Sequence, residues 1–302
     1  MSMGHNHRGE TIMVKRAVCV GINDYSARTD CQSLPDARPD GEAWAQVLPD
    51  AFGFDAANVT LLTDAGATRS AVLSAITTML NQSGAGDVAC FFFAGHGGRG
   101  PSADGKTYYE SICCADAAGD ITDVEINQLA NALQPSYVNF TLVLDSCHSG
   151  GVFDPPPAGA RTQAWSQDQA STFAQCCNAV VPHISIGDIS AILNNVCNIV
   201  QNADGTLRMD INEDLNFSDA AKATLLSACR YDQNSSGTGT HGCFTQALLD
   251  TVNASNFQVS HPDLLERVRQ AITPYSTAQT PQLRGRPVRL EETFLEGWTY
   301  SI

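Results

Sequence analysis

A thiol and an imidazole, each following an apolar run, are the residues of this chain whose types fit covalent chemistry. In "LVLDSCHSGG" three aliphatic residues lead into Asp145, Cys147 and His148. In "FFFAGHGG", 51 residues earlier counting from Cys147 back to His96, an apolar run ends at His96 and Gly97. A thiol attacks a carbonyl carbon as the thiolate, so it needs exposure and a base nearby. His96 is the better candidate base, because the side chains of neighbours such as Cys147 and His148 point in opposite directions.

The glycines beside these residues fit a site built on backbone groups. Gly97 offers an unobstructed backbone N–H to an oxyanion, and Gly150 and Gly151 allow a substrate backbone to approach closely. On residue types alone, a structural cysteine beside a turn explains "LVLDSCHSGG" equally well. The eleven cysteines include no CxxC pair and no Cys/His zinc spacing, so a metal site has no comparable support.

Apolar strands alternate with amphipathic helices, and these elements must position the two groups. Thr68 can cap one helix, and Thr122 with Glu125 forms a capping box at the start of another. The alternation implies an α/β fold whose mostly parallel central sheet is covered by helices on both faces. The carboxyl ends of such strands form a ligand crevice, where His96 and Cys147 both fall. The predicted strands are 15–23, 58–64, 86–98, 111–116, 139–145 and 223–230, and the predicted helices are 40–48, 69–80, 121–133, 241–252 and 261–272.

The composition is that of an acidic globular protein. A formal net charge of −15 leaves no basic footprint for nucleic acid and favours basic peptides as ligands. No apolar run approaches the roughly 20 residues that a membrane span needs. The opening "MSMGHNHRGETIM" lacks the apolar core of a signal peptide, so we expect a flexible or tag-like leader and a cytoplasmic protein. Cysteines inside apolar runs are expected to be reduced and buried.

Together, "FFFAGHGG" and "LVLDSCHSGG" resemble the paired signatures of the metacaspases, within the caspase-like cysteine peptidases. The resemblance continues in the family's order through "AVCVGINDY", "LPDARPDGEAWAQVL", "LLSACRYDQNSSG", "HGCFTQALLDTV" and "TPQLRG". It covers about two-thirds of the chain and omits mainly residues 155–220. It implies the caspase-like (caspase–hemoglobinase) fold, a single α/β domain with a sheet of about six strands flanked by helices.

The resemblance implies roles for particular residues. Cys147 is expected to be the nucleophile and His96 the general acid and base, with the backbone N–H groups of Gly97 and Cys147 as oxyanion donors. Metacaspases accept Arg or Lys before the scissile bond because carboxylates floor the specificity pocket, and the matching positions here are Asp145 and Asp40. Carboxylates in a partly desolvated pocket bind a guanidinium or ammonium group and repel an acidic side chain. The alternatives are a helix N-cap for Asp40 and a turn former for Asp145.

The chain departs from the family pattern at the calcium site. Many metacaspases are activated by calcium held by four aspartates, and the matching positions here are Tyr109, Asp123, Val124 and Asp154. Calcium takes six to eight oxygen ligands, so we expect calcium activation to be weak or absent and no cofactor to be required. Ala37 and Ala94 occupy pocket-lining positions where the family often has Cys and Ser.

The resemblance also divides the chain into segments. A flexible leader (1–13) precedes a large-subunit-like catalytic region (14–154), a linker or insertion with processing sites (155–222) and a small-subunit-like region (223–302). Proteolysis favours exposed, mobile backbone, so Arg161 in "PAGARTQ" is the first candidate for self-cleavage of a zymogen. Arg208 and Lys222 are further candidates.

The sequence therefore predicts a metacaspase-type cysteine endopeptidase that cuts after Arg or Lys and processes itself. Its partners would be protein or peptide substrates with basic residues, and the resemblance implies a monomer. Two rival hypotheses remain. One is an Asp-specific caspase, which would need basic residues in the pocket. The other is a catalytically silent scaffold that acts through protein contacts.

Overall fold

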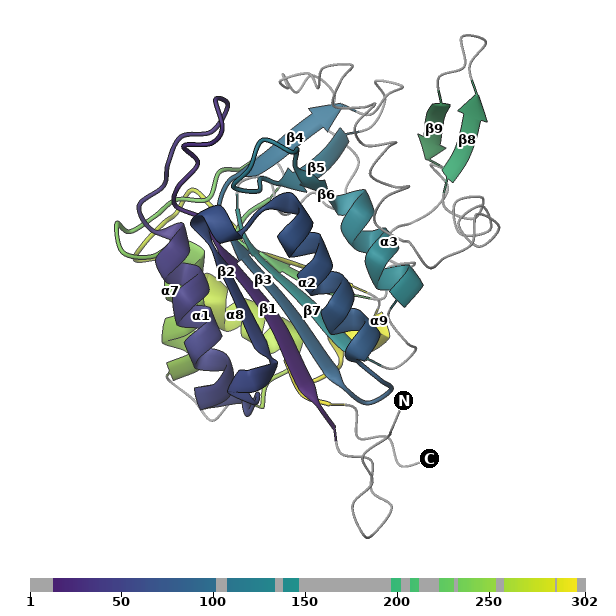
Figure 1. Cartoon of the computed structure of the whole chain (residues 1–302). Coiled ribbons are helices and arrows are strands. Elements are labelled where there is room, and N and C mark those ends of the chain that lie inside the picture. The colour runs from purple at the N-terminus through teal and green to yellow at the C-terminus, as the bar shows by residue number, and fades with distance from the viewer. Residues whose placement is uncertain are drawn as a thin grey trace.

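The computed structural model of the chain is built around one six-stranded sheet (Figure 1). The structure describes residues 13–101, 108–133, 138–146, 197–201, 207–211, 223–230, 233–253, 258–285 and 287–297. The strands of the sheet are β1 (Lys15–Gly21), β2 (Val59–Thr63), β3 (Val88–Ala94), β7 (Asn139–Asp145), β10 (Thr224–Ser227) and β11 (Gln282–Arg284). Their order is β11-β10-β7-β3-β1-β2, and every pair is parallel except β10 with β11. The predicted mostly parallel sheet of six strands is confirmed.

The two central strands are buried along their whole length, because helices cover both faces of the sheet. Every residue of β3 and of β7 is buried. Successive side chains alternate between the faces: Phe91 and Phe93 belong to one apolar core, and Phe92 belongs to the other. Trp44 stacks on Phe92, with the ring centroids 5.6 Å apart. A continuous apolar run in the sequence is thus a strand buried on both sides.

The helices form one layer on each face. On one face lie α1 (Ala37–Phe52), α7 (Cys243–Asn253) and α8 (His261–Ile272); on the other lie α2 (Arg69–Gln82) and α3 (Asp123–Leu133) (Figure 1). A short helix, α9 (Pro287–Leu290), follows β11, and two 3-10 turns span Ala56–Asn58 and Asp64–Gly66. None of the helices in the described ranges has the length and apolar character that a membrane crossing requires.

The predicted helix caps are present. The hydroxyl of Thr68 accepts a hydrogen bond from the Ala71 N–H at 3.2 Å. At the start of α3, the Glu125 N–H donates to the Thr122 hydroxyl (3.2 Å) and the Thr122 N–H donates to the Glu125 carboxylate (3.0 Å). The other oxygen of Glu125 pairs with Arg69, so this capping box also ties α3 to α2.

Two smaller sheets complete the described strands. β4 (Gly97–Pro101), β5 (Tyr108–Ile112) and β6 (Ile121–Thr122) form an antiparallel sheet, and β8 (Cys197–Gln201) pairs with β9 (Leu207–Ile211). The predicted strand 111–116 is therefore displaced: β5 ends at Ile112. The predicted strand 86–98 is two strands, because Gly95, at φ 159°, breaks the run between β3 and β4.

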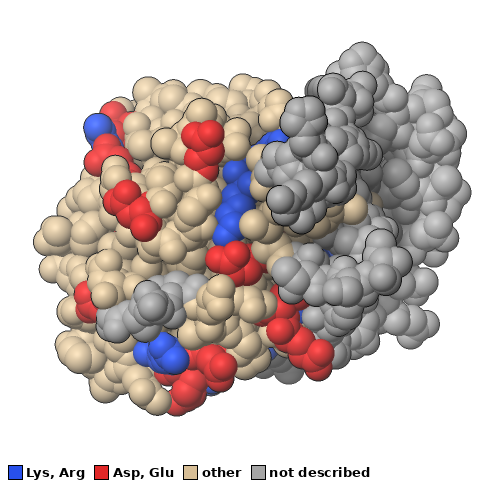
Figure 2. Space-filling view, turned by 90° about the horizontal axis from the view of Figure 1, so that it is seen from below, with Lys and Arg blue, Asp and Glu red and all other residues tan. Residues whose placement is uncertain are grey.

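Charged residues at the start of β1 tie the sheet to the end of the chain. The buried Lys15 ammonium donates to the carbonyl oxygens of Phe52 (2.8 Å) and Leu295 (2.9 Å) and pairs with Glu296 at 2.9 Å. Figure 2 views the molecule from below, the side on which β1 begins in Figure 1, and its basic side chains lie beside acidic ones. The described part of this face has no broad basic surface.

The cysteines whose side chains the structure describes are free thiols. Six of them are buried, and Cys31 is partly exposed. The six buried ones are Cys19, Cys90, Cys113, Cys114, Cys229 and Cys243. Cys19 and Cys90 sit at 0% exposure in the neighbouring strands β1 and β3, where a thiol packs as a small apolar group.

Candidate active site at the carboxyl edge of the sheet

The ends of β3 and β7 lie side by side and deliver the two predicted catalytic residues. The strands are parallel and in register, with Ala94 paired with Asp145. The Gly95 N–H donates to the Asp145 carbonyl at 3.2 Å, which extends the pairing past the strand. His96 follows at the end of one strand and Cys147 at the end of the other. Cys147 lies outside the described residues, so its contact with His96 stays a prediction.

The imidazole of His96 is held by a backbone carbonyl. His96 Nε2 lies 2.7 Å from the carbonyl oxygen of Gln32. A carbonyl only accepts hydrogen bonds, so Nε2 carries the proton and Nδ1 of the neutral ring keeps its lone pair. A base whose second nitrogen is fixed in this way is oriented for proton transfer. Sequence reasoning missed Gln32, because its contribution is a main-chain oxygen that any residue type would supply.

Tyr25 supports the backbone of His96. Its hydroxyl accepts a hydrogen bond from the His96 N–H at 3.0 Å and donates to the Cys113 carbonyl at 3.2 Å. The rings of Tyr25 and His96 lie 4.9 Å apart between centroids. Burial raises the pKa of Tyr25. A Cβ at Gly95 would stand 2.5 Å from the Tyr25 hydroxyl and 2.9 Å from the Phe93 ring. Glycine is therefore required where the chain turns from β3 toward His96.

Gly97 begins β4 and pairs with Ile112 of β5. The carbonyl of the preceding His96 accepts a hydrogen bond from the Cys113 N–H at 2.9 Å. These contacts fix the backbone on both sides of the His96–Gly97 peptide. The role of the Gly97 N–H as an oxyanion donor stays a prediction, since its partner donor would be the N–H of Cys147.

Asp145 is buried at the end of β7 and accepts hydrogen bonds from the first turn of α7 and from the segment before it. One of its carboxylate oxygens accepts a hydrogen bond from the Ser235 hydroxyl at 2.6 Å. The other accepts from the N–H (3.0 Å) and the hydroxyl (2.7 Å) of Thr245. Burial nevertheless raises the pKa of Asp145, and the negative charge of Asp36 acts in the same direction. The carboxylate is held by its contacts and does not merely form a turn.

Asp40 lies in the first turn of α1 and faces the same segment. Its oxygens contact His241 Nδ1 at 2.8 Å and accept the Gly242 N–H at 2.9 Å. Burial, then the negative charge of Asp145, raises the pKa of Asp40 to about 9. The alternative role of Asp40 as the helix N-cap is wrong, because α1 begins three residues earlier than expected and Asp36 is its N-cap residue.

A turn between β10 and α7 covers these carboxylates, and two of its glycines explain how. Gly237 and Gly242 form an antiparallel bridge. A Cβ on Gly242 would collide with the Asp145 carboxylate and lie 3.0 Å from Asp40 Oδ2, and a Cβ on Gly237 would collide with the Asp36 carboxylate. Three carboxylates from two distant segments therefore lie against one turn. Sequence reasoning found Asp145 and Asp40 but missed Asp36, Ser235, His241 and Thr245.

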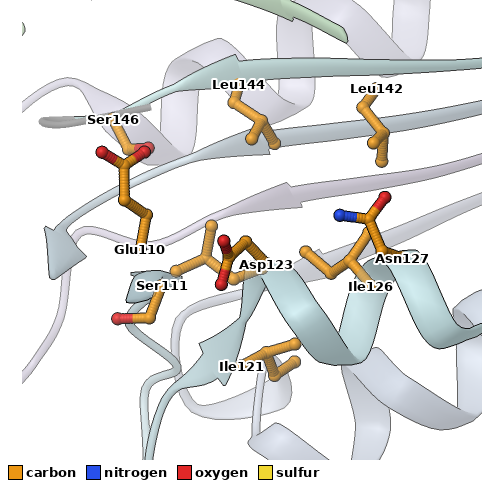
Figure 3. Close-up of a pocket in the computed structure, with 10 residues that line it drawn as sticks. Glu110, Ser111, Ile121, Asp123, Ile126, Asn127, Leu142, Leu144 and Ser146 are labelled. Atoms are coloured by element: carbon orange, nitrogen blue, oxygen red, sulfur yellow. The ribbon is translucent and has the colours of Figure 1, made fainter. Parts of the chain in front are cut away.

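Of the predicted calcium positions, Asp123 lines a pocket to which none of these three carboxylates belongs. Asp123 is the first residue of α3 and lines a pocket between β5, α3 and β7, where Figure 3 shows it with Glu110 on the side facing β7. Ser146, the last described residue before Cys147, also lines that pocket. No group of three or more His, Cys, Asp or Glu side chains within the described ranges is arranged to hold a metal ion. Asp154 lies outside those ranges.

The structure does not describe the side chain of any of the three self-cleavage candidates. Arg161 and Lys222 lie outside the described residues. Arg208 lies on β9, where it pairs with Val200 of β8 and where only the backbone is described.

Comparison with known proteins matches nearly the whole chain to one family. Residues 14–290 match the caspase domain. Metacaspase-1 of Schizosaccharomyces pombe is 28% identical over 289 aligned residues, covering 89% of this chain and 66% of that protein. Metacaspase-9 of Arabidopsis thaliana is 26% identical over 326 aligned residues, covering 94% of this chain and 98% of that protein. The chain therefore spans just under two thirds of the fission-yeast relative and nearly all of the plant relative.

Solved structures share the fold at lower identity. A crystal structure of a Geobacter sulfurreducens protein superposes with a TM-score of 0.64 at 21% identity, covering 94% of this chain and 99% of that one. Caspase-1 from Spodoptera frugiperda superposes with a TM-score of 0.53 at 13% identity, covering 100% of this chain and 94% of that one. At these identities the likeness concerns the fold alone.

Proposed function

The chain belongs to the caspase-domain family of cysteine peptidases, with metacaspases among its relatives, and from that premise we propose that it is an endopeptidase that cleaves peptide bonds after Arg or Lys. The observation that carries the proposal is the placement of buried Asp40 and Asp145 beneath one turn, at the strand end that leads to Cys147. A buried acidic group of this kind suits a basic side chain and disfavours an acidic one.

The first half of the reaction forms an acyl-enzyme. His96 Nδ1 takes the proton of Cys147, and the thiolate attacks the scissile carbonyl carbon, whose oxygen becomes an oxyanion. The N–H groups of Gly97 and Cys147 stabilise that oxyanion. The imidazolium then gives its proton to the leaving amine, the C–N bond breaks, and a thioester remains on Cys147.

Water completes the cycle. Neutral His96 takes a proton from a water molecule that attacks the thioester, and the tetrahedral intermediate collapses to a carboxylic acid and the thiolate. The hydrogen bond from Nε2 to the Gln32 carbonyl keeps the ring in one orientation through both halves. The Tyr25 hydroxyl, which receives the His96 N–H, keeps the backbone fixed beneath it.

The acidic group gives the substrate preference a physical basis. Charge-assisted hydrogen bonds between carboxylates and a guanidinium are strong where water is excluded. An aspartate side chain in the same place would meet buried like charge. This argues against the alternative hypothesis that the enzyme is an Asp-specific caspase.

We extend the proposal to maturation and regulation. Cleavage after basic residues would let the enzyme process itself at Arg161, with Arg208 and Lys222 as further sites. Two carboxylates, Asp123 and Asp154, supply too few charged ligands for strong calcium affinity, so activity would need little or no calcium. We further propose that the protein acts on proteins in the cytoplasm, as a monomer, with the four segments of the chain making one caspase-like domain.

The test is a set of fluorogenic peptides that end in Arg, Lys or Asp, assayed with wild type and Cys147→Ala, with calcium and with a chelator. We expect cleavage of the Arg and Lys peptides by wild type alone, at similar rates under both conditions. Faster cleavage of the Asp peptide would establish the Asp-specific hypothesis. No difference between wild type and Cys147→Ala would establish the silent scaffold.

A further inference from the structure

Asp36 differs from the other two carboxylates under the turn in its hydrogen bonds. Asp145 accepts three hydrogen bonds through its two oxygens, and Asp40 has a partner at each oxygen. A carboxylate offers about four lone-pair sites. In the described part of the chain no donor reaches the side chain of Asp36, although the residue is only 9% exposed. A nearly buried carboxylate without a protein donor is uncommon and needs an explanation, such as an acceptor role toward a bound molecule.

The position of Asp36 makes the missing hydrogen bond informative. It is the N-cap residue of α1, where an aspartate usually accepts an N–H of the first helical turn. Here its side chain makes no capping hydrogen bond. The N–H of Arg38 in that turn is satisfied instead by the Asn23 side chain from the end of β1, at 2.7 Å. Asn23 therefore leaves the carboxylate of Asp36 available for another partner.

The turn between β10 and α7 places Asp36 in the same group as Asp40 and Asp145. Gly237 lies against the Asp36 carboxylate, and its bridge partner Gly242 lies against the other two. The negative charge of Asp36 also helps to raise the pKa of both Asp40 and Asp145. The described basic residue nearest in the sequence, Arg38, is already paired with Glu42 and Asp64. The group therefore gathers three carboxyl groups, of which only that of Asp36 has no described hydrogen-bond donor.

We propose that Asp36 is the main acceptor for the basic side chain of the substrate, and that Asp40 and Asp145 chiefly build and orient the pocket around it. This inference rests on the proposed cleavage after Arg or Lys, and it names the residue that chiefly determines that preference. A guanidinium carries five N–H donors, which suits a carboxylate with all its lone pairs unused. Asp145, by contrast, would have to share oxygens that already bind Ser235 and Thr245.

The experiment compares two peptides that differ only in charge. One has Arg before the scissile bond, and the other has citrulline, a neutral side chain of the same shape. We would measure kcat and KM for both with wild type, Asp36→Asn, Asp40→Asn and the matched control Asp50→Asn, which removes an exposed carboxylate from the far end of α1. Active sites are counted with a thiol-reactive inhibitor, so misfolded enzyme does not enter the ratio.

The expected result is a loss of charge discrimination. A hydrogen bond to a charged group supports a change of about tenfold to a hundredfold. The Arg-to-citrulline ratio of kcat/KM should fall by that factor in Asp36→Asn, mainly through KM, and by less in Asp40→Asn. It should be unchanged in Asp50→Asn. If Asp36 had a purely structural role, Asp36→Asn would lower kcat/KM for both peptides by the same factor. The Arg-to-citrulline ratio would then stay as in wild type.

A second variant tests the same inference without removing the Asp36 carboxylate. Gly237→Ala adds a methyl group against Asp36 and should lower the same ratio by displacing it. A wild-type ratio in both Asp36→Asn and Gly237→Ala overturns the inference and leaves the proposed function standing. If wild type cleaves neither Arg nor Lys peptides, the proposed function fails first and the inference with it.

Discussion

The acidic group should make the free protein less stable as the pH rises, and Asp40→Asn should remove part of that dependence. Asn can keep both contacts of Asp40. Its carbonyl oxygen accepts the Gly242 N–H, and its amide donates to His241 Nδ1. The substitution therefore changes the charge of a buried group while preserving its hydrogen bonds. A gain in stability at the expense of a functional site is a familiar trade-off.

The size of the effect follows from the pKa of Asp40, which burial and Asp145 raise from 3.8 to about 9. Between these values the unfolded chain has lost the proton and the folded protein retains it. The free energy of unfolding then falls as the pH rises, by up to about 1.4 kcal/mol per pH unit. From pH 5.5 to 8.5 this amounts to at most about 4 kcal/mol. The stabilising contribution is complete below pH 4 and lost as the pH passes 9.

Urea unfolding at pH 5.5, 7.0 and 8.5 measures this effect, with Cys147→Ala as the background so that the protein cannot digest itself. We expect Asp40→Asn to be more stable than its parent, by a margin that grows by about 2–4 kcal/mol between pH 5.5 and pH 8.5. Asp50→Asn in the same background should follow the parent at each pH. Parallel curves for the parent and Asp40→Asn would refute the assignment of a buried, protonated carboxyl to Asp40.

Four further outcomes follow from single contacts. Gly242→Ala forces a methyl group against Asp145 and Asp40, so Arg-peptide kcat/KM should fall more than about tenfold and stability by about 1–3 kcal/mol; wild-type kinetics would contradict the described packing. Tyr25→Phe removes the hydroxyl that links the backbones of His96 and Cys113, so kcat should fall about tenfold at constant KM. A change in KM alone would contradict this positioning role of Tyr25. Thr122→Ala breaks the capping box and should cost about 1 kcal/mol in urea unfolding, with no change expected in kcat. Adding a chelator should change the peptidase rate by less than about twofold, and a much larger loss of rate would show that calcium is required.

The sheet was predictable because its central strands are apolar on both faces. The predicted strand 139–145 has the same bounds as β7, and β3 lies within 86–98. The caps at Thr68 and Thr122 were predictable for a similar reason, since each depends on residues three positions apart or fewer.

The surroundings of the site were not predictable, because they depend on contacts between distant segments. Asp145 is held by Thr245 and Asp40 by His241, and these partners lie 100 and 201 residues away in the chain. The start of α1 was misplaced because Asn23, in the loop after β1, satisfies an N–H of the first helical turn in place of Asp36. Gln32 acts through its main chain, which has no signature in the sequence.

The central claim is that the thiol at position 147 is a nucleophile served by a pocket for positive charge. Labelling tests it directly, with peptidyl acyloxymethyl ketones that carry Arg or Asp next to the reactive group, followed by mass spectrometry of the digested protein. We predict that the Arg reagent modifies Cys147 and no other cysteine, and that the Asp reagent leaves it unmodified. Modification of a different cysteine, or equal reaction with both reagents, would contradict the account.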